Sequence, residues 1–481
     1  MTDLELKKYG LKIYMRNPSS YTPLLEPGGL NGRAKSLTIG KDPQQNAEQI
    51  AQFSLKDAKA FCVYEELLDR IVTALDPLLD NPPVSLPSLM GSSLRDKWSS
   101  VGPVRALATS LKSLGKDLPA FYELMTAPAQ KILNRWFESE PLKATLATDS
   151  VIGAMISPMH PGSGYVLLHH VMGEIEGVKG AWGYVEGGMG GVSQAIANCA
   201  QDHGAAVFCN KQVSSIIVSN NSVKGVVLSD GTEIRAKAVL SNATAKITYL
   251  NLVPQGILPE EIVKELETYD YTSPVTKINV AVDRIPNFIA DPNIERNKPM
   301  PHHRCSIHIN CENSQLIHDS YLEAQLGKIT ERPMIEMVIP SSLDPTLCPP
   351  GKHVVLLFTQ FTPYKLADGD WNDERKNKYA DIVFDSIENY APGFKSSVIG
   401  RDILAPPDLE SIFGLTGGNI FHGSLSLDQL YLSRPTTSLA NYRCPISGLY
   451  LCGSSSHPGG GVMGATGRLA AYTALGDFKS L

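Results

Sequence analysis

Apolar residues recur at helical spacing over the first third of the chain. After Ser54-Leu55-Lys56-Asp57 the apolar side chains of one such run stand three or four residues apart, and Pro77 closes it: Phe61, Tyr64, Leu68, Ile71 and Leu75. Serine and aspartate side chains accept from free N–H groups at a helix start, so the tetrapeptide predicts a capping box. Segments 92–113 and 119–138 show a similar pattern. A mainly helical region is therefore predicted up to residue 182.

Beyond Gly183 the pattern changes to short alternating runs. A glycine-rich turn at 187–191 opens a predicted helix, and a strand is expected at 205–209. Three further β-runs with Asn, Asp and Gly turns between them predict a β-meander, whose last run is long enough to break in two: 213–218, 224–229 and 232–240. Alternating strands of a second sheet are predicted in the following stretch, at 277–282, 306–310, 334–339 and 354–359. One amphipathic helix is predicted after them, at 376–390.

Composition limits the classes of partner. The chain has 481 residues, a net charge of −6 and 43% hydrophobic residues. It therefore offers no general attraction for nucleic acid, and no apolar run reaches the roughly 20 residues that span a bilayer. The eight cysteines include no Cys-x-x-Cys pair, which argues against a dithiol centre. The first residues show neither a secretory signal nor an Arg-rich presequence. A small-molecule partner is expected.

The strongest chemical signal is a glycine-rich loop near the C-terminus. An apolar strand at 449–452 leads into Gly453–Gly464, and a helix is predicted from about Ala465 to Phe478. A helix N-terminus presents free N–H groups with a partial positive charge, and glycines let a ligand approach that backbone closely. Such a loop suits a phosphate or the edge of a cofactor that becomes anionic on reduction.

Two other interpretations of the same loop are weaker. Gly459-x-Gly461-x-x-Gly464 matches the dinucleotide fingerprint in form, but six residues separate it from its strand and no room follows for the next strand and its acidic residue. Gly453-x-Ser455-x-His457 resembles a nucleophile elbow without its closing glycine. A tight strand–helix turn with no ligand is the remaining alternative.

Several separate motifs together resemble the phytoene desaturase-like flavoproteins, the carotenoid and retinoid oxidoreductases. The C-terminal motif is Gly453 with the run His457-Pro458-Gly459-Gly460-Gly461-Val462. The other motifs that fit are Gly187-Gly188-Met189-Gly190, Asp230-Gly231, Ser241-Asn242-Ala243, Gly418–Gly423, Asp428-Gln429, Arg434-Pro435, Tyr442 and Pro445. The similarity extends over essentially the whole chain.

The resemblance departs from the family at the start of the chain. Family members begin with a strand, a Gly-x-Gly-x-x-Gly turn and a helix that hold the FAD pyrophosphate, whereas Leu4–Lys12 resembles a point well inside the family sequence. The expected fold is therefore an α/β two-domain FAD-binding flavoprotein with a β-meander and a mixed helical and sheet substrate domain, lacking the first βαβ unit. The FAD side would comprise 183–256 and 436–481, and the substrate side 31–182 and 257–435, with 1–30 as a remnant leading into the fold.

The resemblance implies an FAD-dependent oxidoreductase acting on a carbon–carbon bond of an apolar, polyene-like substrate. It also implies a mitochondrial matrix setting and contact with a respiratory-chain subunit. The flavin ring would lie against the C-terminal loop, and the backbone of an early meander residue would meet the adenine. The cofactor-binding residues implied are Val213, Gly453, Ser454, His457, Pro458, Gly459, Gly460, Gly461, Val462 and Gly464.

His422, Gln429 and Arg434 are the polar candidates for catalysis on the substrate side of the ring. Histidine can exchange a proton near neutral pH, and arginine can fix a polar group. The equally weighted alternative is that all three tie a loop in place. His457 precedes a proline and is expected to orient the flavin loop rather than to transfer protons.

Two histidine groups are assigned structural roles. Around 302–311, three histidines and two cysteines have the composition of a metal site, but on a strand Cys305 and Cys311 face away from His308 and would not converge with it. His169-His170 lies in an apolar helical stretch and is expected to pack there. No metal site is therefore predicted.

Two hypotheses outside the enzyme class stay open. A scaffold or regulatory form would bind FAD weakly or not at all, because the N-terminal dinucleotide-binding unit is absent from this sequence. A carrier would hold an apolar ligand without chemistry. The substrate, the direction of electron flow and the oligomeric state are not specified by any motif.

Overall fold

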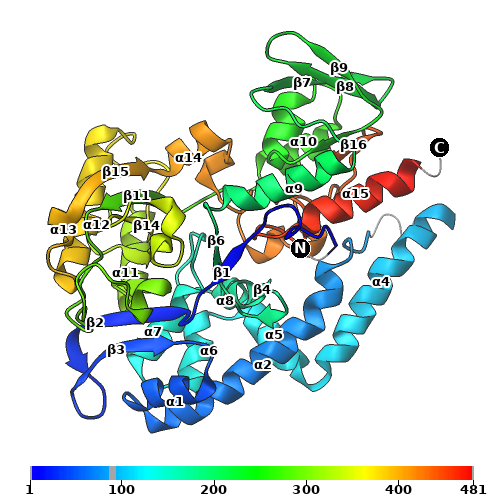
Figure 1. Cartoon of the computed structure of the whole chain (residues 1–481). Helices are drawn as coiled ribbons and strands as arrows, with labels where there is room; N and C mark the ends of the chain where they lie inside the picture. Colours follow the sequence, from blue (N-terminus) through cyan, green and yellow to red (C-terminus); the bar gives the residue numbers. More distant parts are fainter. Residues whose placement is uncertain (1–2, 86–93, 479–481) are drawn as a thin grey trace. The chain divides into compact units, whose positions relative to one another are not determined.

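The computed structural model describes residues 3–85 and 94–478 (Figure 1). The chain forms two compact units. Unit 1 comprises Met1–Asp69, Leu124–Phe208 and Pro274–Ala405, and unit 2 comprises Arg70–Glu123, Cys209–Ser273 and Pro406–Leu481. The domain boundaries predicted from the sequence lie instead at 182, 256 and 435, so each unit is assembled from segments that the composition alone does not separate.

A seven-stranded mixed sheet organises unit 1. Its order is β15-β11-β14-β13-β12-β2-β3, and every neighbouring pair is antiparallel except β12 and β2. The strands are β2 (Ser20–Gly28), β3 (Ala34–Ile39), β11 (Thr276–Val282), β12 (Ser306–Ile309), β13 (Met334–Val338), β14 (His353–Gln360) and β15 (Val398–Leu404). The four strands predicted for a second sheet are confirmed. The leading segment is not a mere remnant, because β2 is an integral strand of this sheet.

One face of the sheet is packed against α12 (Asp373–Tyr390), the predicted amphipathic helix. Ile278, Ile307 and Ile335 on alternate positions of their strands are buried in one core with Val383 and Ile387 of the helix. Since successive strand residues point to opposite faces, the polar residues between these isoleucines lie on the other face. The sheet therefore has one apolar face and one face that carries charged side chains.

Helices and short strands complete unit 1. The strand pairs β1 (Ile13–Met15) with β6 (Gly183–Val185) and β4 (Glu174–Ile175) with β5 (Val178–Lys179) are antiparallel. The helices are α1 (Pro43–Ala51), the start of α2 (Leu55–Leu79), the end of α5 (Leu118–Thr126), α6 (Ala129–Trp136), α7 (Glu140–Thr148), α8 (Ser163–Val171), α9 (Gly190–Asp202), α11 (Ser314–Gln325) and α13 (Phe394–Ser397). The predicted helix at 119–138 is thus two helices with Pro128 between them.

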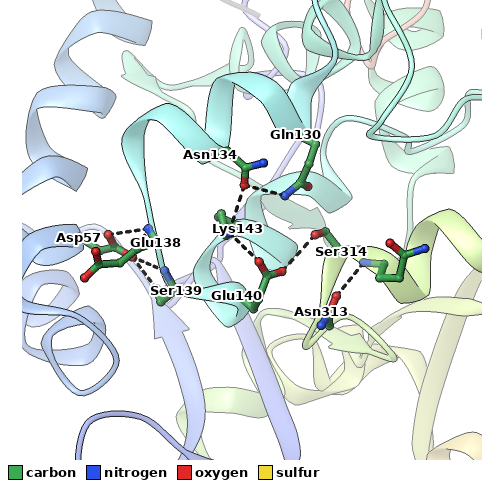
Figure 2. Close-up of polar contacts among 10 residues, drawn as sticks. Asp57, Gln130, Asn134, Glu138, Ser139, Glu140, Lys143, Asn313 and Ser314 are labelled. Atoms are coloured by element: carbon green, nitrogen blue, oxygen red, sulfur yellow. Dashed lines mark hydrogen bonds and ion pairs between the residues drawn. The ribbon is translucent and has the colours of Figure 1, made fainter.

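The predicted capping box at the start of α2 is only half right. The Ser54 hydroxyl accepts from the N–H of Asp57 at 3.1 Å, as predicted. The buried Asp57 carboxylate, however, accepts from the backbone N–H groups of Glu138 and Ser139 and from the Ser139 hydroxyl, at 2.6–3.2 Å (Figure 2). These donors lie directly ahead of α7, so Asp57 fixes the start of a different helix.

The same close-up shows how α6, α7 and α11 are joined within unit 1. Lys143 on α7 donates to Asn134 on α6 at 3.1 Å and pairs with Glu140 at 2.6 Å. Glu140 accepts from the hydroxyl of Ser314 at 3.2 Å, and Asn313 caps α11 through the N–H of Gln315. Side-chain hydrogen bonds thereby hold α7 to its sequence neighbour α6 and to α11, which is distant in sequence.

We expect Asp57→Ala to lower the free energy of unfolding by about 3 kcal/mol, because three donors lose the hydrogen bonds that they make to the buried Asp57 carboxylate. The matched control is Glu138→Gln: that carboxylate accepts from Ser54 and Lys56 but is 55% exposed, so its loss should cost less than about 1 kcal/mol. Urea unfolding followed by circular dichroism measures both. Equal losses in the two variants would contradict the role given to Asp57.

Unit 2 contains the predicted β-meander and a parallel strand pair. The meander is β7 (Val213–Ser219), β8 (Ser222–Leu228) and β9 (Glu233–Arg235), and β10 (Val239–Ser241) pairs in parallel with β16 (Leu449–Leu451). The last predicted run is thus divided into β9 and β10. The helices are the end of α2, α4 (Leu94–Leu114), the start of α5, a π-helix (Ile247–Leu252), α10 (Glu260–Glu267), α14 (Pro406–Phe413) and α15 (Ala465–Phe478). The first two residues of the predicted helix 92–113 lie outside the described residues.

One hydrophobic core connects the meander to the C-terminal strand. Ile216 of β7 and Val223 of β8 are buried together with Leu449 and Leu451 of β16 and with Leu266 of α10. The turn between β7 and β8 is made by Asn220 and Asn221, both at positive φ, as the hairpin prediction requires. The strand that carries the glycine loop is therefore fixed from one side by the meander.

The prediction of a strand at 205–209 is wrong. These residues form no strand, and Val207 and Phe208 are 45% and 75% exposed. A strand is stable only where its N–H and C=O groups find a partner strand, and none of the described strands pairs with this segment. A run of apolar residues alone cannot supply that partner.

No helix in the described part of the chain is both long and apolar enough to cross a membrane.

Candidate functional site

The glycine-rich loop of unit 2 begins at a close backbone contact. After β16, a Cβ atom on Gly453 would lie 2.4 Å from the carbonyl oxygen of Asn242, which follows β10. Only glycine fits there, since real Cβ contacts are not that short. The Gly453 carbonyl then accepts from the N–H of Ser456, so the chain turns sharply as it leaves the strand.

The middle of the loop is buried and its end is exposed. A Cβ atom on Gly460 would lie 2.5 Å from the ring of Phe421, and Gly459 lies against Arg434 with φ +108°. From Gly461 to Gly464 the backbone is exposed, immediately ahead of α15. Val462 and Met463 are 76% and 45% exposed there. The loop therefore presents apolar side chains and the free N–H groups of a helix N-terminus together.

His457 holds the loop rather than lying open to a ligand. Its Nε2 atom is 2.7 Å from the carbonyl oxygen of Leu78, its ring packs edge-on to Tyr431, and its own carbonyl accepts from the Tyr442 hydroxyl at 2.7 Å. Burial lowers the pKa of His457 to about 4, so the ring is neutral at physiological pH. The peptide to Pro458 is cis. These contacts fix the position of the loop, and the role of His457 toward a flavin stays a prediction.

Arg434 connects the glycine-rich loop to the segment 421–429. Its side chain is fully buried, and among the described residues its guanidinium donates only to backbone carbonyl oxygens: Ser454 at 3.0 Å, Phe421 at 2.5 Å, Gln429 at 3.2 Å and Ser424 at 3.3 Å. Nε therefore holds the glycine loop while the two Nη atoms hold the segment 421–429. The donors that sequence reasoning directed to a substrate are used within the protein.

Gln429 has a similar bonding pattern. Its side-chain oxygen accepts from the N–H of Asp270 at 2.7 Å, and its Nε2 donates to the Asp270 carbonyl at 3.0 Å. A longer bond reaches the Ser424 carbonyl. The amide thus pairs with one backbone unit as a neighbouring strand would. Gln429 and Arg434 are positioning residues in this geometry.

His422 differs from these two. Its carbonyl accepts from the Ser455 hydroxyl at 2.9 Å, but its Nδ1 atom finds no partner among the described residues. Burial, assisted by the charge of Arg434, lowers the pKa of His422 to about 4. A neutral imidazole with an uncommitted ring nitrogen can hydrogen-bond a ligand, but it is a weak base at neutral pH.

The remaining predicted residues flank the loop. Ser454 contributes its carbonyl to Arg434 and its side chain is half-buried. Val213 begins β7 opposite Leu228, in the meander whose core also contains β16. The residues that sequence reasoning missed are the supports: Asn242, Phe421, Tyr431 and the carbonyl of Leu78. Two of them had a signal, since Phe421 lies inside the motif 418–423 and Asn242 inside the motif Ser241-Asn242-Ala243.

The histidines and cysteines around 302–311 have the predicted arrangement. Cys305 and Ile307 belong to the apolar core, and His308 lies on the other face of β12. The His303 ring is 2.9 Å from the Pro286 carbonyl and accepts from the N–H of Met300. His170, on α8, is buried with its ring against the Val166 carbonyl. Hydrogen bonds to the backbone therefore hold the His303 and His170 rings in place.

Comparison with known proteins gives the family. No family model matches the chain. Pyridine nucleotide-disulfide oxidoreductase domain-containing protein 2 of Rattus norvegicus is 58% identical over 482 residues, covering all of this chain and 83% of the rat protein. The Mus musculus protein of the same name is 56% identical over the same span. Phytoene desaturase (lycopene-forming) of Pseudescherichia vulneris is 25% identical over 71% of this chain and 64% of its own length.

Among solved structures, a triple variant of putrescine oxidase from a redesign of cofactor binding has a TM-score of 0.53 at 13% identity. The match covers all of this chain and 85% of the oxidase. That likeness confirms the expected flavoprotein oxidoreductase fold. Over its full length, this chain is identical to the rat oxidoreductase-domain protein at more than half of all positions. It therefore belongs to the family of pyridine nucleotide-disulfide oxidoreductase domain-containing protein 2.

Proposed function

We propose that this chain is an FAD-dependent oxidoreductase that acts on a carbon–carbon bond of an apolar, polyene-like substrate. The observation that carries the proposal is the loop between β16 and α15. Its backbone is exposed from Gly461 to Gly464, at the positive end of a fourteen-residue helix. Support for the substrate class comes from the resemblance to phytoene desaturase, a relative named for its action on a polyene.

The residues present fit the ring of a flavin. The backbone N–H groups ahead of α15 can donate to its polar edge, and the exposed Val462 and Met463 side chains can contact its flat face. FAD, when bound, supplies the capacity to accept and return a hydride. Arg434 and His457 would keep the loop in place, and His422 would orient a neighbouring group through its uncommitted Nδ1.

The mitochondrial matrix location and the respiratory-chain contact are also proposed. They rest on the family resemblance of the sequence, not on any contact described above. The absence of a nucleic-acid partner is proposed as well, and it rests on the net charge of −6.

The test is flavin retention. We expect the purified chain, incubated with excess FAD and passed through gel filtration, to keep about one flavin per chain by visible absorbance. Gly464→Val should lower the affinity at least about tenfold, because the new side chain occupies the exposed backbone surface. The fold should tolerate it, since no atom lies within 4 Å of the added Cβ. Gly476→Val, in the last turn of α15 with equal space around it, is the matched control.

A version extended with the part of the rat relative that the chain does not match separates the outcomes. Flavin in both versions supports the proposal for this chain. If only the extended version retains flavin, the oxidoreductase activity would be assigned to the longer protein. A scaffold role would then be the better interpretation of this chain. A colourless protein in both cases, or equal affinity in the two glycine variants, would overturn the proposed cofactor site.

A further inference from the structure

The polar face of the large sheet in unit 1 carries a row of side chains that the proposed function does not use. Lys277, Phe358, Glu336 and His308 lie directly opposite one another on β11, β14, β13 and β12. Residues directly opposite on neighbouring strands share a face and lie about 5 Å apart. This face is the one opposite α12, because residues that flank the four along their strands belong to the apolar core shared with α12: Ile278, Leu357, Ile335, Met337, Ile307 and Ile309.

Arg16 joins this row from the segment ahead of β2. Its side chain is 5% exposed, and its Nη1 donates to the Ser306 hydroxyl at 2.5 Å. That hydroxyl donates to Glu336 at 2.6 Å. The guanidinium lies 5.2 Å from the ring centroid of Trp182 and 5.3 Å from that of Tyr184. Aromatic rings and a hydroxyl thus fix the arginine without a direct carboxylate partner in the described residues.

Three hydrogen-bonding atoms of this group are buried and have no partner among the residues that the structure describes. They are Nε of Arg16, Nδ1 of His308 and the hydroxyl of Tyr184. Leaving such an atom unpaired costs about 1–3 kcal/mol, so native proteins contain few of them. Arg Nε–H and Tyr O–H are donors here, and what they lack is an acceptor. An oxygen-bearing ligand would supply it.

The charges around the row favour an anionic acceptor. Arg16 and Lys277 are the cations, and Glu336 and Asp149 are the acids that act on them. Burial raises the pKa of Asp149 to about 7 and lowers the pKa of Lys277 to about 8. Burial thus favours the neutral forms of both Asp149 and Lys277. The guanidinium of Arg16 stays protonated in proteins, so it is the fixed positive charge that an anionic ligand would meet.

Apolar side chains adjoin the row on the same face. Phe358 lies between Lys277 and Glu336, and Leu356 lies opposite Val338 one row along. All three apolar side chains are half-buried, whereas their neighbours on the α12 face are completely buried. A hydrocarbon chain can therefore contact them while its polar end reaches the donors.

We propose that this face of the unit 1 sheet binds a monocarboxylic acid with an apolar body, its carboxylate accepting from Arg16 Nε, Tyr184 and His308 and its chain lying over Phe358 and Leu356. Arginine is the side chain best suited to a carboxylate, because its planar fork donates in fixed directions. The site stands on contacts within unit 1 alone. It does not depend on the flavin loop, which belongs to unit 2.

Titration calorimetry with octanoate and 1-octanol tests the site on the full chain. The two probes share an alkyl chain and differ in the head group. We expect octanoate to bind at least about tenfold more tightly, the ratio that one charge-assisted hydrogen bond supplies. Tyr184→Phe removes only the unpartnered hydroxyl, so it should fold normally and weaken octanoate about three- to tenfold. Arg16→Gln should reduce octanoate to the affinity of octanol.

Arg401→Gln is the matched control. Arg401 lies on β15 of the same sheet and also stands over an aromatic ring, Phe384, but it donates to Asp381 and Asn377. It should leave octanoate binding unchanged. Equal affinity for the two probes, no saturable octanoate binding at millimolar concentration, or unchanged binding by Tyr184→Phe would overturn the site. If Arg16→Gln fails to fold, the Tyr184 variant alone decides. Flavin retention is measured separately, so the two proposals can fail independently.

Discussion

Replacing Arg434 with methionine should lower the free energy of unfolding by about 4 kcal/mol, because four backbone carbonyl oxygens, two of them in buried hydrogen bonds and two in partly buried ones, lose their donor at once. The methionine fills much of the volume but donates nothing. The loss should appear in urea unfolding as a lower midpoint with an unchanged slope. Arg434→Lys should recover less than half of it, since one ammonium cannot reach carbonyls on both sides of the planar guanidinium.

Arg235→Met provides the comparison for the Arg434 variants. Arg235 is on β9 of the same unit, and its side chain is 65% exposed beside Glu233. Its replacement should cost less than about 1 kcal/mol. If Arg434→Met costs no more than this, the arginine does not hold the loops together, and its charge would then be available for a ligand as the sequence first suggested.

The elements that sequence analysis predicted well are those whose signal is local. The alternation in β11 and β13 and the helical period of α12 specify a half-buried strand and an amphipathic helix whatever surrounds them. The position of β2 at one side of the same sheet depends on pairing with β12, whose residues lie far away along the chain. The failed strand at 205–209 shows the converse, since its apolar residues had no partner.

The candidate site likewise contains features with a local sequence signal and features without one. Gly453 and Gly460 could be recognised, because a position where other atoms lie close to the backbone requires glycine, and glycine is visible in the sequence. The partners of Arg434 are carbonyl groups, which every residue possesses, so no pattern distinguishes them. Lys277 and Glu336 did leave a signal: each is the single charged residue of its strand. What could not be predicted is that strand register brings them into one row with His308.

Asp149 gives this row a dependence on pH that runs opposite to that of most carboxylates. Burial is the main cause of the rise in its pKa from 3.8 to about 7, Glu336 adds to it, and Arg16 opposes it. His170 and Tyr64 are further titratable groups that interact with Asp149, and His308, Tyr184 and Lys277 interact with Glu336. The unfolded chain therefore loses this proton more easily than the folded one. Ionisation destabilises the fold progressively from about pH 4 to pH 7.

Asp149→Asn removes that penalty, because an amide stays neutral in both states. Each pKa unit corresponds to about 1.4 kcal/mol, and the partial exposure of Asp149 reduces the full value. We expect the unfolding free energy of the variant, relative to the unsubstituted chain, to rise by about 2 kcal/mol between pH 4 and pH 8. Asp319→Asn, on the exposed face of α11, should show no such change. A difference that stays constant across this range would mean that Asp149 is ionised in the fold at little cost, and the charge balance inferred for the carboxylate site would be less positive.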